Sequence, residues 1–234
     1  MKKYELLKDD TKIMSGRTLY RIKALRECGN VEKGDLGGYI ESENNLSHYG
    51  NAWVYGNARV YDNAEVYGDA RVYGNAEVYG NARVCGNVRV CDNAMVYGDA
   101  MVYDNAEVYG DARVFGNARV FGNAEVYGNT MVYGNARVYD NAEVYGDARV
   151  YGNAWVYGNA RVNLEDDYIV FKNNWSSGRY FTYTKSNKMW KVGCFYGTGQ
   201  ELIEKAYADS ELSGKCYESY VKLVEQLEEI QEVE

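Results

Sequence analysis

The chain has 234 residues with 25 glycines, 25 tyrosines and no proline, and its net charge is −8. An acidic chain of this kind is a poor candidate for nonspecific binding to DNA or to an anionic membrane, so we expect neither partner. Proline cannot donate a backbone hydrogen bond, and its absence indicates regular backbone pairing along much of the chain.

The cysteines and the first residues indicate a cytoplasmic protein. The five cysteines are an odd number with no CxxC spacing, which is typical of reduced thiols rather than of disulfides or a zinc site. They are Cys28, Cys85, Cys91, Cys194 and Cys216. The opening MKKYELLKDDTK has no apolar core of a secretory signal, and no segment reaches the ~18 apolar residues of a membrane span. We expect no metal and no cofactor.

Residues 1–47 are predicted to form an N-terminal cap. They contain the strand-like run TLYRIKAL (18–25) and then KGDLGGYIESENNLS (33–47). Counting back six residues at a time from Ala52 gives Leu46 and Ile40. The column of small buried residues in the following repeat is therefore predicted to begin at these two positions, with larger side chains.

Residues 48–163 carry a strict repeat. From Val54 to Arg161 the chain divides into eighteen consecutive hexapeptides of the form V-[YFC]-[GD]-[ND]-[ATV]-x. Each unit alternates inward small or apolar residues with outward ones, as a short strand does, and then supplies Gly, Asn or Asp for a corner. Strict Val and near-strict Ala positions favour an ordered register over a disordered low-complexity repeat.

This pattern resembles the hexapeptide signature of left-handed parallel β-helices. The resemblance implies three hexapeptides per triangular coil, and so six coils with a core of stacked Val and Ala. The open ends of such a solenoid need caps against strand addition.

Residues 164–234 are predicted to form a small α+β domain. Three strand-like runs, DYIVFK, RYFTYTK and KMWKVGCF, precede two helices. The first helix begins with a capping box of Thr198 and Glu201. The second helix is predicted to bury one apolar face, formed by Tyr217, Val221, Val224, Leu227 and Ile230.

The two flanks also resemble known proteins. RTLYRIKALRECGNVEKGDLGGYIESENNLS resembles the leader of bacterial and phage hexapeptide-repeat proteins that are labelled as acyltransferases. SNKMWKVGCFYGTGQELIEKAYADSELSGKCYESYV is similar to a small domain of phage and prophage proteins of unknown function. These resemblances imply a phage-encoded protein that acts in the host cytoplasm.

The residues do not favour an enzyme. Hexapeptide-repeat acyltransferases use a histidine as general base beside loops that leave the coils. The one histidine here, His48, has the phase of the valine column, which predicts an inward, partly covered residue at the first coil. The uninterrupted hexapeptides leave no loop for an acceptor pocket. We therefore expect no catalytic residues, with an acyltransferase using acetyl-CoA as the alternative.

Three other features have simple structural interpretations. The GTG of residues 197–199 lacks the lysine of a phosphate-binding loop and is interpreted as a turn and helix cap. Cys194 has no histidine nearby in the sequence to activate it. The acidic run Glu165, Asp166 and Asp167 is interpreted as a solvated turn.

With three hexapeptides per coil, outward residues eighteen apart stack into three columns. The first contains Arg59, Glu77, Met95, Arg113, Met131 and Arg149. The second contains Glu65, Arg83, Met101, Arg119, Arg137 and Trp155. The third contains Trp53, Arg71, Arg89, Glu107, Glu125, Glu143 and Arg161. A column of Tyr, Phe or Cys runs beside each.

The columns suggest binding surfaces. Stacked Tyr rings stabilise strand ladders, and Tyr, Arg, Met and Trp are also enriched at protein interfaces. The candidate binding residues are Arg83, Met101, Arg119, Arg137, Trp155, Tyr139, Tyr157 and Trp190. The third column is split by charge, which suggests antiparallel self-association through Arg71, Arg89, Glu107, Glu125 and Glu143.

The sequence thus predicts a nonenzymatic β-solenoid scaffold or interaction protein. We expect it to bind a host protein or another macromolecule through the solenoid faces or the C-terminal domain. The resemblance of the flanks to phage proteins implies that this binding interferes with a host system. We also expect a homo-oligomer, a trimer or a dimer, because β-helix relatives are commonly trimers and the Tyr-rich faces are extensive.

Overall fold

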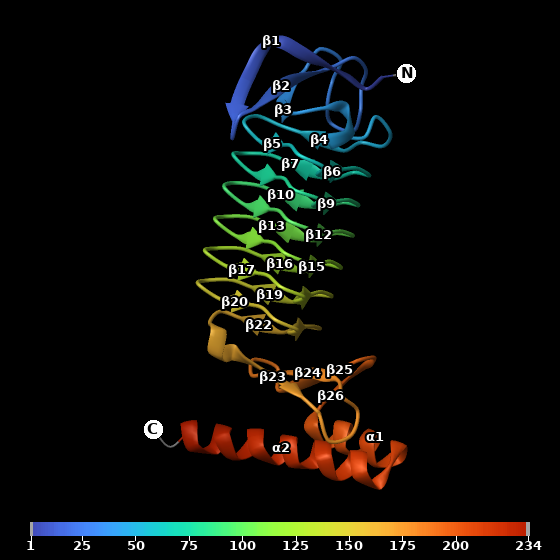
Figure 1. Ribbon diagram of the computed structural model, residues 1–234, viewed down its shortest axis with the longest axis vertical. Helices are drawn as coiled ribbons and strands as arrows, with labels where there is room; N and C mark the ends of the chain where they lie inside the picture. Colours follow the sequence, from blue (N-terminus) through green and yellow to red (C-terminus); the bar gives the residue numbers. More distant parts are fainter. Residues whose placement is uncertain (1, 233–234) are drawn as a thin grey trace.

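The computed structural model describes residues 2–232, which form a parallel β-solenoid between two different end structures (Figure 1). Antiparallel strands lie at the N-terminal end, and a small sheet with two helices lies at the other end. One wall of the solenoid contains seven strands, so the solenoid has about seven turns where the sequence predicted six. The mainly β fold with a small α+β segment is confirmed; the hand of the coil stays a prediction.

The N-terminal end is a three-stranded meander that runs into the solenoid. Strand β1 (Tyr4–Met14) pairs antiparallel with β2 (Arg17–Ala24), and β2 pairs antiparallel with β3 (Leu36–Ile40). Strand β3 then pairs parallel with the first strand of a solenoid wall. The sequence indicated β2 but not β1, because the alternation of β1 is interrupted by the charged residues 8–10 and by a bulge.

The solenoid has three walls of two-residue strands, six residues apart along the chain. The first wall continues β3 with β5 (Arg59–Val60), β8 (Glu77–Val78), β11 (Met95–Val96), β14 (Arg113–Val114), β17 (Met131–Val132) and β20 (Arg149–Val150). The second wall is β6 (Glu65–Val66), β9 (Arg83–Val84), β12 (Met101–Val102), β15 (Arg119–Val120), β18 (Arg137–Val138) and β21 (Trp155–Val156). The third wall is β4 (Trp53–Val54), β7 (Arg71–Val72), β10 (Arg89–Val90), β13 (Glu107–Val108), β16 (Glu125–Val126), β19 (Glu143–Val144) and β22 (Arg161–Val162).

The register of the walls confirms the predicted columns. Parallel pairs join residues eighteen apart, such as Arg59 with Glu77 and Arg119 with Arg137. Every strand valine is buried, as are the small residues that precede each strand. Fully burying one valine contributes about 1.5–3 kcal/mol relative to exposure, so the core gains stability turn by turn.

The corners of the solenoid require left-handed backbone. Glycine occupies most of these positions with φ near +70°, and Asp62, Asp92, Asp104 and Asp140 occupy the others with φ between 59° and 66°. Aspartate is accommodated because its carboxylate accepts a hydrogen bond from the glycine N–H of the next turn, as Asp104 does from Gly122 at 3.3 Å. The corners thus combine conformational freedom with close contact between turns.

A matched pair of glycine substitutions separates these two requirements. Gly122 has φ of +72°, and a Cβ atom there would lie 2.8 Å from the backbone nitrogen of Asp140. Gly152 has φ of +66° but open space around the same position. We expect Gly152→Ala to cost about 1–2 kcal/mol for the backbone conformation alone. Gly122→Ala should cost about 1–3 kcal/mol more because of the clash, measured as free energies of unfolding. Equal costs would contradict the close stacking of turns.

The two ends of the solenoid are capped by opposite hydrogen-bonding groups. Backbone N–H groups point toward the C-terminal end, as in the bond from Arg59 N–H to Ala76 O, so carbonyl oxygens are free at the N-terminal end. There the Lys3 ammonium donates to Ala52 O at 2.7 Å and the Tyr4 hydroxyl donates to Leu46 O at 2.7 Å. The unpaired edge that invites strand addition is therefore occupied.

At the C-terminal end, hydroxyl oxygens accept from the last free N–H groups. Trp155 N–H donates to Thr182 Oγ1 at 2.9 Å, and Arg161 N–H donates to Ser186 Oγ at 2.8 Å. The residues that follow the repeat thus satisfy the last turn of the solenoid with side chains in place of a further strand.

The register of the first turn differs from the prediction. Ile40 pairs with Val60 and Leu46 with Val66, so both occupy the valine column and not the small-residue column. These pairs are twenty residues apart because the segment from Ser47 to Asn51 contains two more residues than a hexapeptide allows. His48 lies in this segment and is therefore not part of the inward valine column.

The C-terminal segment forms an antiparallel sheet and two helices. The strands are β23 (Tyr168–Lys172), β24 (Tyr180–Thr184), β25 (Met189–Val192) and β26 (Phe195–Gly197). Helix α1 (Gly199–Asp209) begins at the predicted capping box, in which Thr198 and Glu201 exchange hydrogen bonds. The acidic run 165–167 forms a short 3₁₀ turn, as expected.

Helix α2 (Glu211–Glu232) buries only part of its predicted face. Tyr217 and Val224 pack against the sheet, but Leu227 is 44% exposed and Ile230 is 62% exposed, so their predicted burial is wrong. The inward face continues instead with Glu228, whose carboxylate accepts a hydrogen bond from the Tyr183 hydroxyl at 2.5 Å. Neither helix of the described part of the chain is long and apolar enough to cross a membrane.

Candidate functional site

The aromatic residues of each wall form stacks, which are continuous on the first wall and are interrupted by Cys85 on the second and by Cys91 on the third. Tyr61, Tyr79, Tyr97 and Phe115 on the first wall stack with ring centroids 4.9–5.0 Å apart and nearly parallel planes. Similar stacks follow the second and third walls. Because all three walls share this feature, the stacks support the ladder and do not by themselves mark one binding face.

The charges on the third wall are largely neutralised within the chain. Arg89 forms an ion pair with Glu107 at 3.0 Å, and Arg161 with Glu143 at 3.2 Å. Glu125 accepts a hydrogen bond from the Tyr109 hydroxyl at 3.0 Å. Of the five residues predicted for self-association, only Arg71 has no such side-chain bond among the described residues.

The first residue of this column, Trp53, was predicted to point outward but is fully buried beneath the N-terminal strands, 6.1 Å from the ring of Tyr4.

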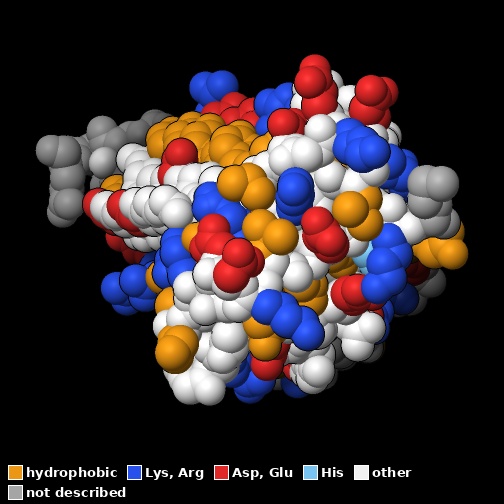
Figure 2. Space-filling model, turned by 90° about the horizontal axis from the view of Figure 1, so that it is seen from above, with side chains coloured by type: hydrophobic (Ala, Val, Ile, Leu, Met, Phe, Trp, Pro, Cys, Tyr) orange, Lys and Arg blue, Asp and Glu red, His pale blue; other side chains and the backbone are white. Residues whose placement is uncertain are grey.

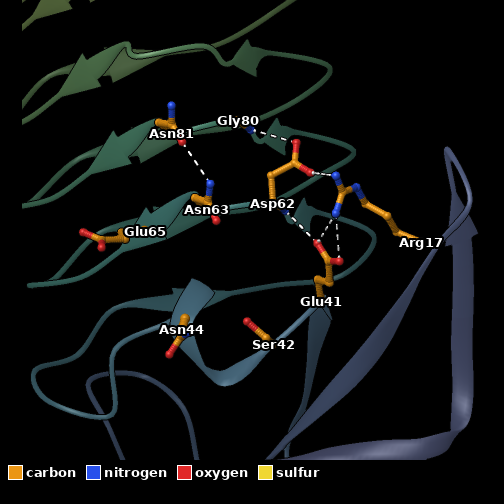
Figure 3. A pocket seen from close by; sticks show the side chains of 9 residues that line it. All are labelled: Arg17, Glu41, Ser42, Asn44, Asp62, Asn63, Glu65, Gly80 and Asn81. Carbon is orange, nitrogen blue, oxygen red and sulfur yellow. Dashed lines mark hydrogen bonds and ion pairs between the residues drawn. The ribbon is translucent and has the colours of Figure 1, made fainter.

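A hollow of about 650 Å³ lies at the N-terminal end, between β2 and the first turns. Figure 3 shows Arg17 reaching from β2 toward Glu41 and Asp62, with Arg17–Glu41 at 3.0 Å and Arg17–Asp62 at 2.5 Å. Asp62 also accepts a hydrogen bond from Gly80 N–H at 3.1 Å. These bonds tie the cap to the solenoid and neutralise the Arg17 guanidinium within the hollow.

The rest of this end has no broad surface of one kind. Figure 2 shows acidic, basic and apolar side chains intermixed over the N-terminal face. The N-terminal end therefore offers no broad surface of a single charge or of apolar character.

A second hollow of about 490 Å³ lies where the second wall meets the C-terminal sheet; we call it the junction groove. It is lined by Asn135, Arg137, Asn153, Trp155, Gly178, Arg179, Tyr180 and Gly193. The wall contributes Arg137 and Trp155, whose guanidinium and indole ring are 4.7 Å apart. The loops around β24 contribute Arg179 and Tyr180. The groove therefore combines two cations with two large aromatic rings.

The cations of the junction groove have no acidic partners. Among residues 2–232, no carboxylate lies within ion-pair distance of Arg119, Arg137 or Arg179, whereas Arg83, nearer the N-terminal end, is 3.8 Å from Glu65. Arg119 and Arg137 stack directly on neighbouring strands of the second wall. Like charges so close together are normally destabilising. The arrangement concentrates uncompensated positive charge on a chain that is acidic as a whole.

Lys191 is a third cation and lies next to the groove. Its side chain is 8% exposed, and its ammonium lies 4.4 Å from the centroid of the Tyr157 ring and 6.0 Å from that of Trp155. Burial lowers the pKa of Lys191, since the charged form loses hydration there. Its positive charge faces aromatic rings and no carboxylate among the described residues.

The predicted binding residues are thus partly brought together. Arg137, Trp155, Tyr139 and Tyr157 lie at or next to the junction groove, and Arg83, Met101 and Arg119 lie further along the second wall. The prediction that Trp190 is a surface binding residue is wrong. Its side chain is 2% exposed because it packs in the core between the C-terminal sheet and the helices.

The sequence analysis missed two charged or aromatic residues that line the groove, Arg179 and Tyr180, and the adjacent Lys191. They belong to the strands and turns after the repeat, and nothing in their local sequence indicates that they meet the second wall. A charged residue within a strand, as in M-W-K-V at β25, was the one available signal.

His48 does not lie in a hollow shared with other chemical groups. Its ring stacks on Tyr4 with centroids 4.4 Å apart, and its Nδ1 accepts a hydrogen bond from Lys3 N–H at 3.2 Å. Its Nε2 is 3.4 Å from Glu43, and the side chain is 23% exposed. This placement agrees with a partly covered residue at the end of the solenoid.

Residues 2–232 contain neither a disulfide nor a cluster of side chains that could bind a metal ion. The five cysteines are free, and no group of three or more His, Cys, Asp or Glu residues there could hold a metal ion.

Fold and site together define a parallel β-solenoid with a mixed α/β end structure. A family model described as the YdcK β-solenoid repeat matches four segments of the chain, residues 52–68, 88–104, 112–128 and 142–158. All four lie in the solenoid, so the similarity concerns the repeat and not the flanking segments. A comparison with curated proteins gave no match.

Proposed function

We propose that this protein is a nonenzymatic interaction protein whose solenoid presents the junction groove to an acidic segment of a partner protein. The observation that carries the proposal is the uncompensated positive charge of Arg119, Arg137 and Arg179 beside the partly exposed Trp155 and the exposed Tyr180. Carboxylates of a partner would pair with the guanidinium groups, and an apolar side chain of the same segment would pack on Trp155 and Tyr180.

The scaffold supports such a role. Parallel strands fix the outward side chains of the second wall at regular intervals, so the recognition residues are held before the partner arrives. Preorganisation of this kind reduces the entropy lost on binding. A nucleic acid would also provide negative charge, but the net charge of −8 opposes its approach at long range.

The resemblance of the two flanks supports a phage origin and a partner in the bacterial host. Binding to a host protein would then interfere with the system to which that protein belongs. This part of the proposal rests on the sequence of residues 17–47 and 186–221 and not on the groove.

An acyltransferase that uses acetyl-CoA is less well supported. The strands from β4 to β22 follow each other every six residues, so the coils have no extruded loop to form an acceptor site. His48 is engaged by Tyr4, Lys3 and Glu43 at the end of the solenoid. We expect a calorimetric titration with acetyl-CoA to give no saturable heat.

A charge-reversal experiment tests the groove. The probe is a synthetic peptide rich in glutamate with one phenylalanine, and binding is followed by the fluorescence of the protein. We expect Arg137→Glu/Arg179→Glu to weaken binding at least about 100-fold, since hydrogen bonds between charged groups are worth about 1.5–3 kcal/mol each. The matched control, Arg113→Glu/Arg149→Glu, reverses two exposed arginines of the first wall.

The control should keep binding within about threefold of the wild type, because surface charges at a distance contribute little at physiological salt. Equal losses in both variants would mean that binding follows net charge alone. An unchanged affinity in the groove variant would refute the junction groove as the site.

A further inference from the structure

The region of the junction groove holds more positive charge than a single carboxylate could balance. Besides Arg137, Arg179 and the adjacent Lys191, a fourth cation lies here. The ammonium of Lys172 is 5.4 Å from the centroid of the Tyr180 ring, which lines the groove. Lys172 ends strand β23, and its side chain is exposed with no carboxylate within ion-pair distance among the described residues. Four cations therefore share one region without an acidic partner.

Lys191 is fixed in this region by the fold. It lies on β25 opposite Thr182 of β24, and Thr182 accepts the hydrogen bond from Trp155 N–H at 2.9 Å. Lys191 is 8% exposed, and its ammonium has no hydrogen-bond or ion-pair partner among the described residues. In the described part of the chain, the side-chain nitrogens that are sealed from solvent without a partner belong to Arg21 and Arg59. The stem of Lys191 is therefore buried, while its unpaired ammonium reaches the surface beside Trp155.

The surroundings of Lys191 disfavour its positive charge in the free protein. Burial lowers the pKa of Lys191, and the nearby thiol of Cys194 opposes this effect in part. The rings of Tyr157 and Tyr139, with centroids 4.4 and 5.8 Å from the ammonium, replace only some of the lost hydration. An anion bound next to the groove would supply the missing compensation.

A dianion matches this charge better than a carboxylate does. At equal distance, each cation attracts a group of charge −2 about twice as strongly as a group of charge −1. A phosphorylated side chain carries about −1.5 to −2 at neutral pH and has three acceptor oxygens, whereas a carboxylate has one negative charge and two oxygens. Guanidinium groups such as those of Arg137 and Arg179 can also bind two phosphate oxygens at once.

We propose that the partner segment in the junction groove carries a phosphorylated side chain, which is bound by the guanidinium groups of Arg137 and Arg179 and the ammonium of Lys191. The proposal rests on the function proposed above, because it takes the occupant of the groove to be an acidic segment of a protein. Lys172, next to Tyr180, pairs with a second acidic residue of the same segment. The groove then distinguishes the phosphorylated form of its partner from the unphosphorylated form.

A single-stranded nucleic acid is the alternative occupant. Sites for single strands combine a basic groove with aromatic rings on which the bases stack. In the junction groove, however, a cation already lies over each ring: Arg137 is 4.7 Å from the Trp155 centroid, and Lys172 is 5.4 Å from that of Tyr180. The net charge of −8 also opposes a long polyanion. These observations favour a phosphorylated protein.

The test compares three peptides, each titrated against the full chain and followed by the fluorescence of the protein. One is the glutamate-rich peptide of the charge-reversal experiment, and in the other two a single glutamate is replaced by phosphoserine or by phosphotyrosine. We expect a phosphopeptide to bind at least about tenfold more tightly at pH 7.5, because a phosphate accepts charge-assisted hydrogen bonds through three oxygens. This advantage should shrink at least about threefold at pH 5, since the phosphate takes up its second proton near pH 6 while glutamate stays mostly ionised.

Two lysine variants locate the phosphate. Lys191→Met keeps a buried stem and removes the charge, so it should reduce the advantage of the phosphopeptides to about threefold or less, with unchanged circular dichroism. The matched control, Lys8→Met, removes an exposed lysine of β1 at the other end of the molecule and should keep the full advantage. The comparison of peptides on the wild type needs no variant and tests the proposal even if Lys191→Met does not fold.

Equal affinity of the wild type for all three peptides would overturn the phosphate proposal and leave the groove as a site for acidic segments. If none of the three peptides binds, the proposed function fails as well. A full advantage in Lys191→Met would contradict the assigned site. An oligonucleotide of the same net charge that binds more tightly than either phosphopeptide would overturn the proposal in favour of a nucleic acid.

Discussion

Val108→Asp is expected to prevent the solenoid from folding under native conditions. Val108 is fully buried in the middle of the third wall, between Val90 and Val126 of the neighbouring turns. A carboxylate there would have valine methyl groups around it and no donor, and burying an unpaired charge costs several kcal/mol or more. We expect a loss of at least about 4–5 kcal/mol, which is a large fraction of the stability of a typical domain.

The neighbouring residue supplies the control. Glu107 lies on the same strand but points outward, where it pairs with Arg89 at 3.0 Å with both side chains partly exposed. Glu107→Asp shortens this side chain and should cost no more than about 1 kcal/mol, the usual range for surface ion pairs. Denaturant unfolding, monitored by circular dichroism, measures the free energy of unfolding of both variants. Similar tolerance at the two positions would show that the inward and outward phases are assigned wrongly.

Alkaline pH is expected to destabilise the protein more steeply than a single titrating group could. Burial raises the pKa of stacked tyrosines such as Tyr79, Tyr97 and Tyr103. A hydrogen bond with Cys85, together with burial, raises the pKa of Tyr67 to about 12. In the unfolded chain these hydroxyls ionise near pH 10. Above that pH the unfolded state binds fewer protons than the folded state, so stability falls as pH rises; below it both states are protonated and the contribution is intact.

The measurement combines denaturant unfolding between pH 8 and pH 11 with the absorbance of tyrosinate, a range set by the ordinary tyrosine pKa of about 10. We expect most of the tyrosinate absorbance to appear together with loss of structure, because most of the rings are stacked or buried. Tyr79→Phe/Tyr97→Phe removes two hydroxyls with no hydrogen-bond partner in the described chain, and Phe115 already stands in the same stack. This variant should match the wild type at pH 8 and lose less stability at pH 11. Ionisation of the buried and stacked tyrosines near pH 10 in an intact fold, seen as most of the tyrosinate absorbance, would contradict the raised pKa values.

The solenoid could be predicted from the sequence because the six-residue period of the repeat corresponds directly to one strand and one corner of the coil. Six residues specify a strand and a corner, and three such units return the chain to the same wall, so the pairing of Arg119 with Arg137 follows from counting. Counting in steps of six residues gave the wrong column only where the repeat is interrupted. The two extra residues between Leu46 and Val54 move Ile40 and Leu46 into the valine column and remove His48 from it.

The candidate site could be predicted only in part, because half of it lies outside the repeat. Arg137 and Trp155 were identified from their column on the second wall. Arg179 and Lys191 reach the same place because the sheet after the repeat caps the last turn, where Thr182 accepts from Trp155 N–H. Local sequence does not encode that contact. The helical period of α2 similarly identifies apolar positions, but it does not decide which of two adjacent faces the sheet covers.

Affinity capture from a bacterial lysate tests the central claim most directly, because the claim is that this protein acts by binding through the junction groove. Three baits are compared: the wild type, Arg137→Glu/Arg179→Glu, and Arg113→Glu/Arg149→Glu. The account predicts that the wild type and the first-wall variant capture the same protein in similar amounts, and that the groove variant does not capture it. Equal capture by all three baits, or release of the captured protein by acetyl-CoA, would contradict it.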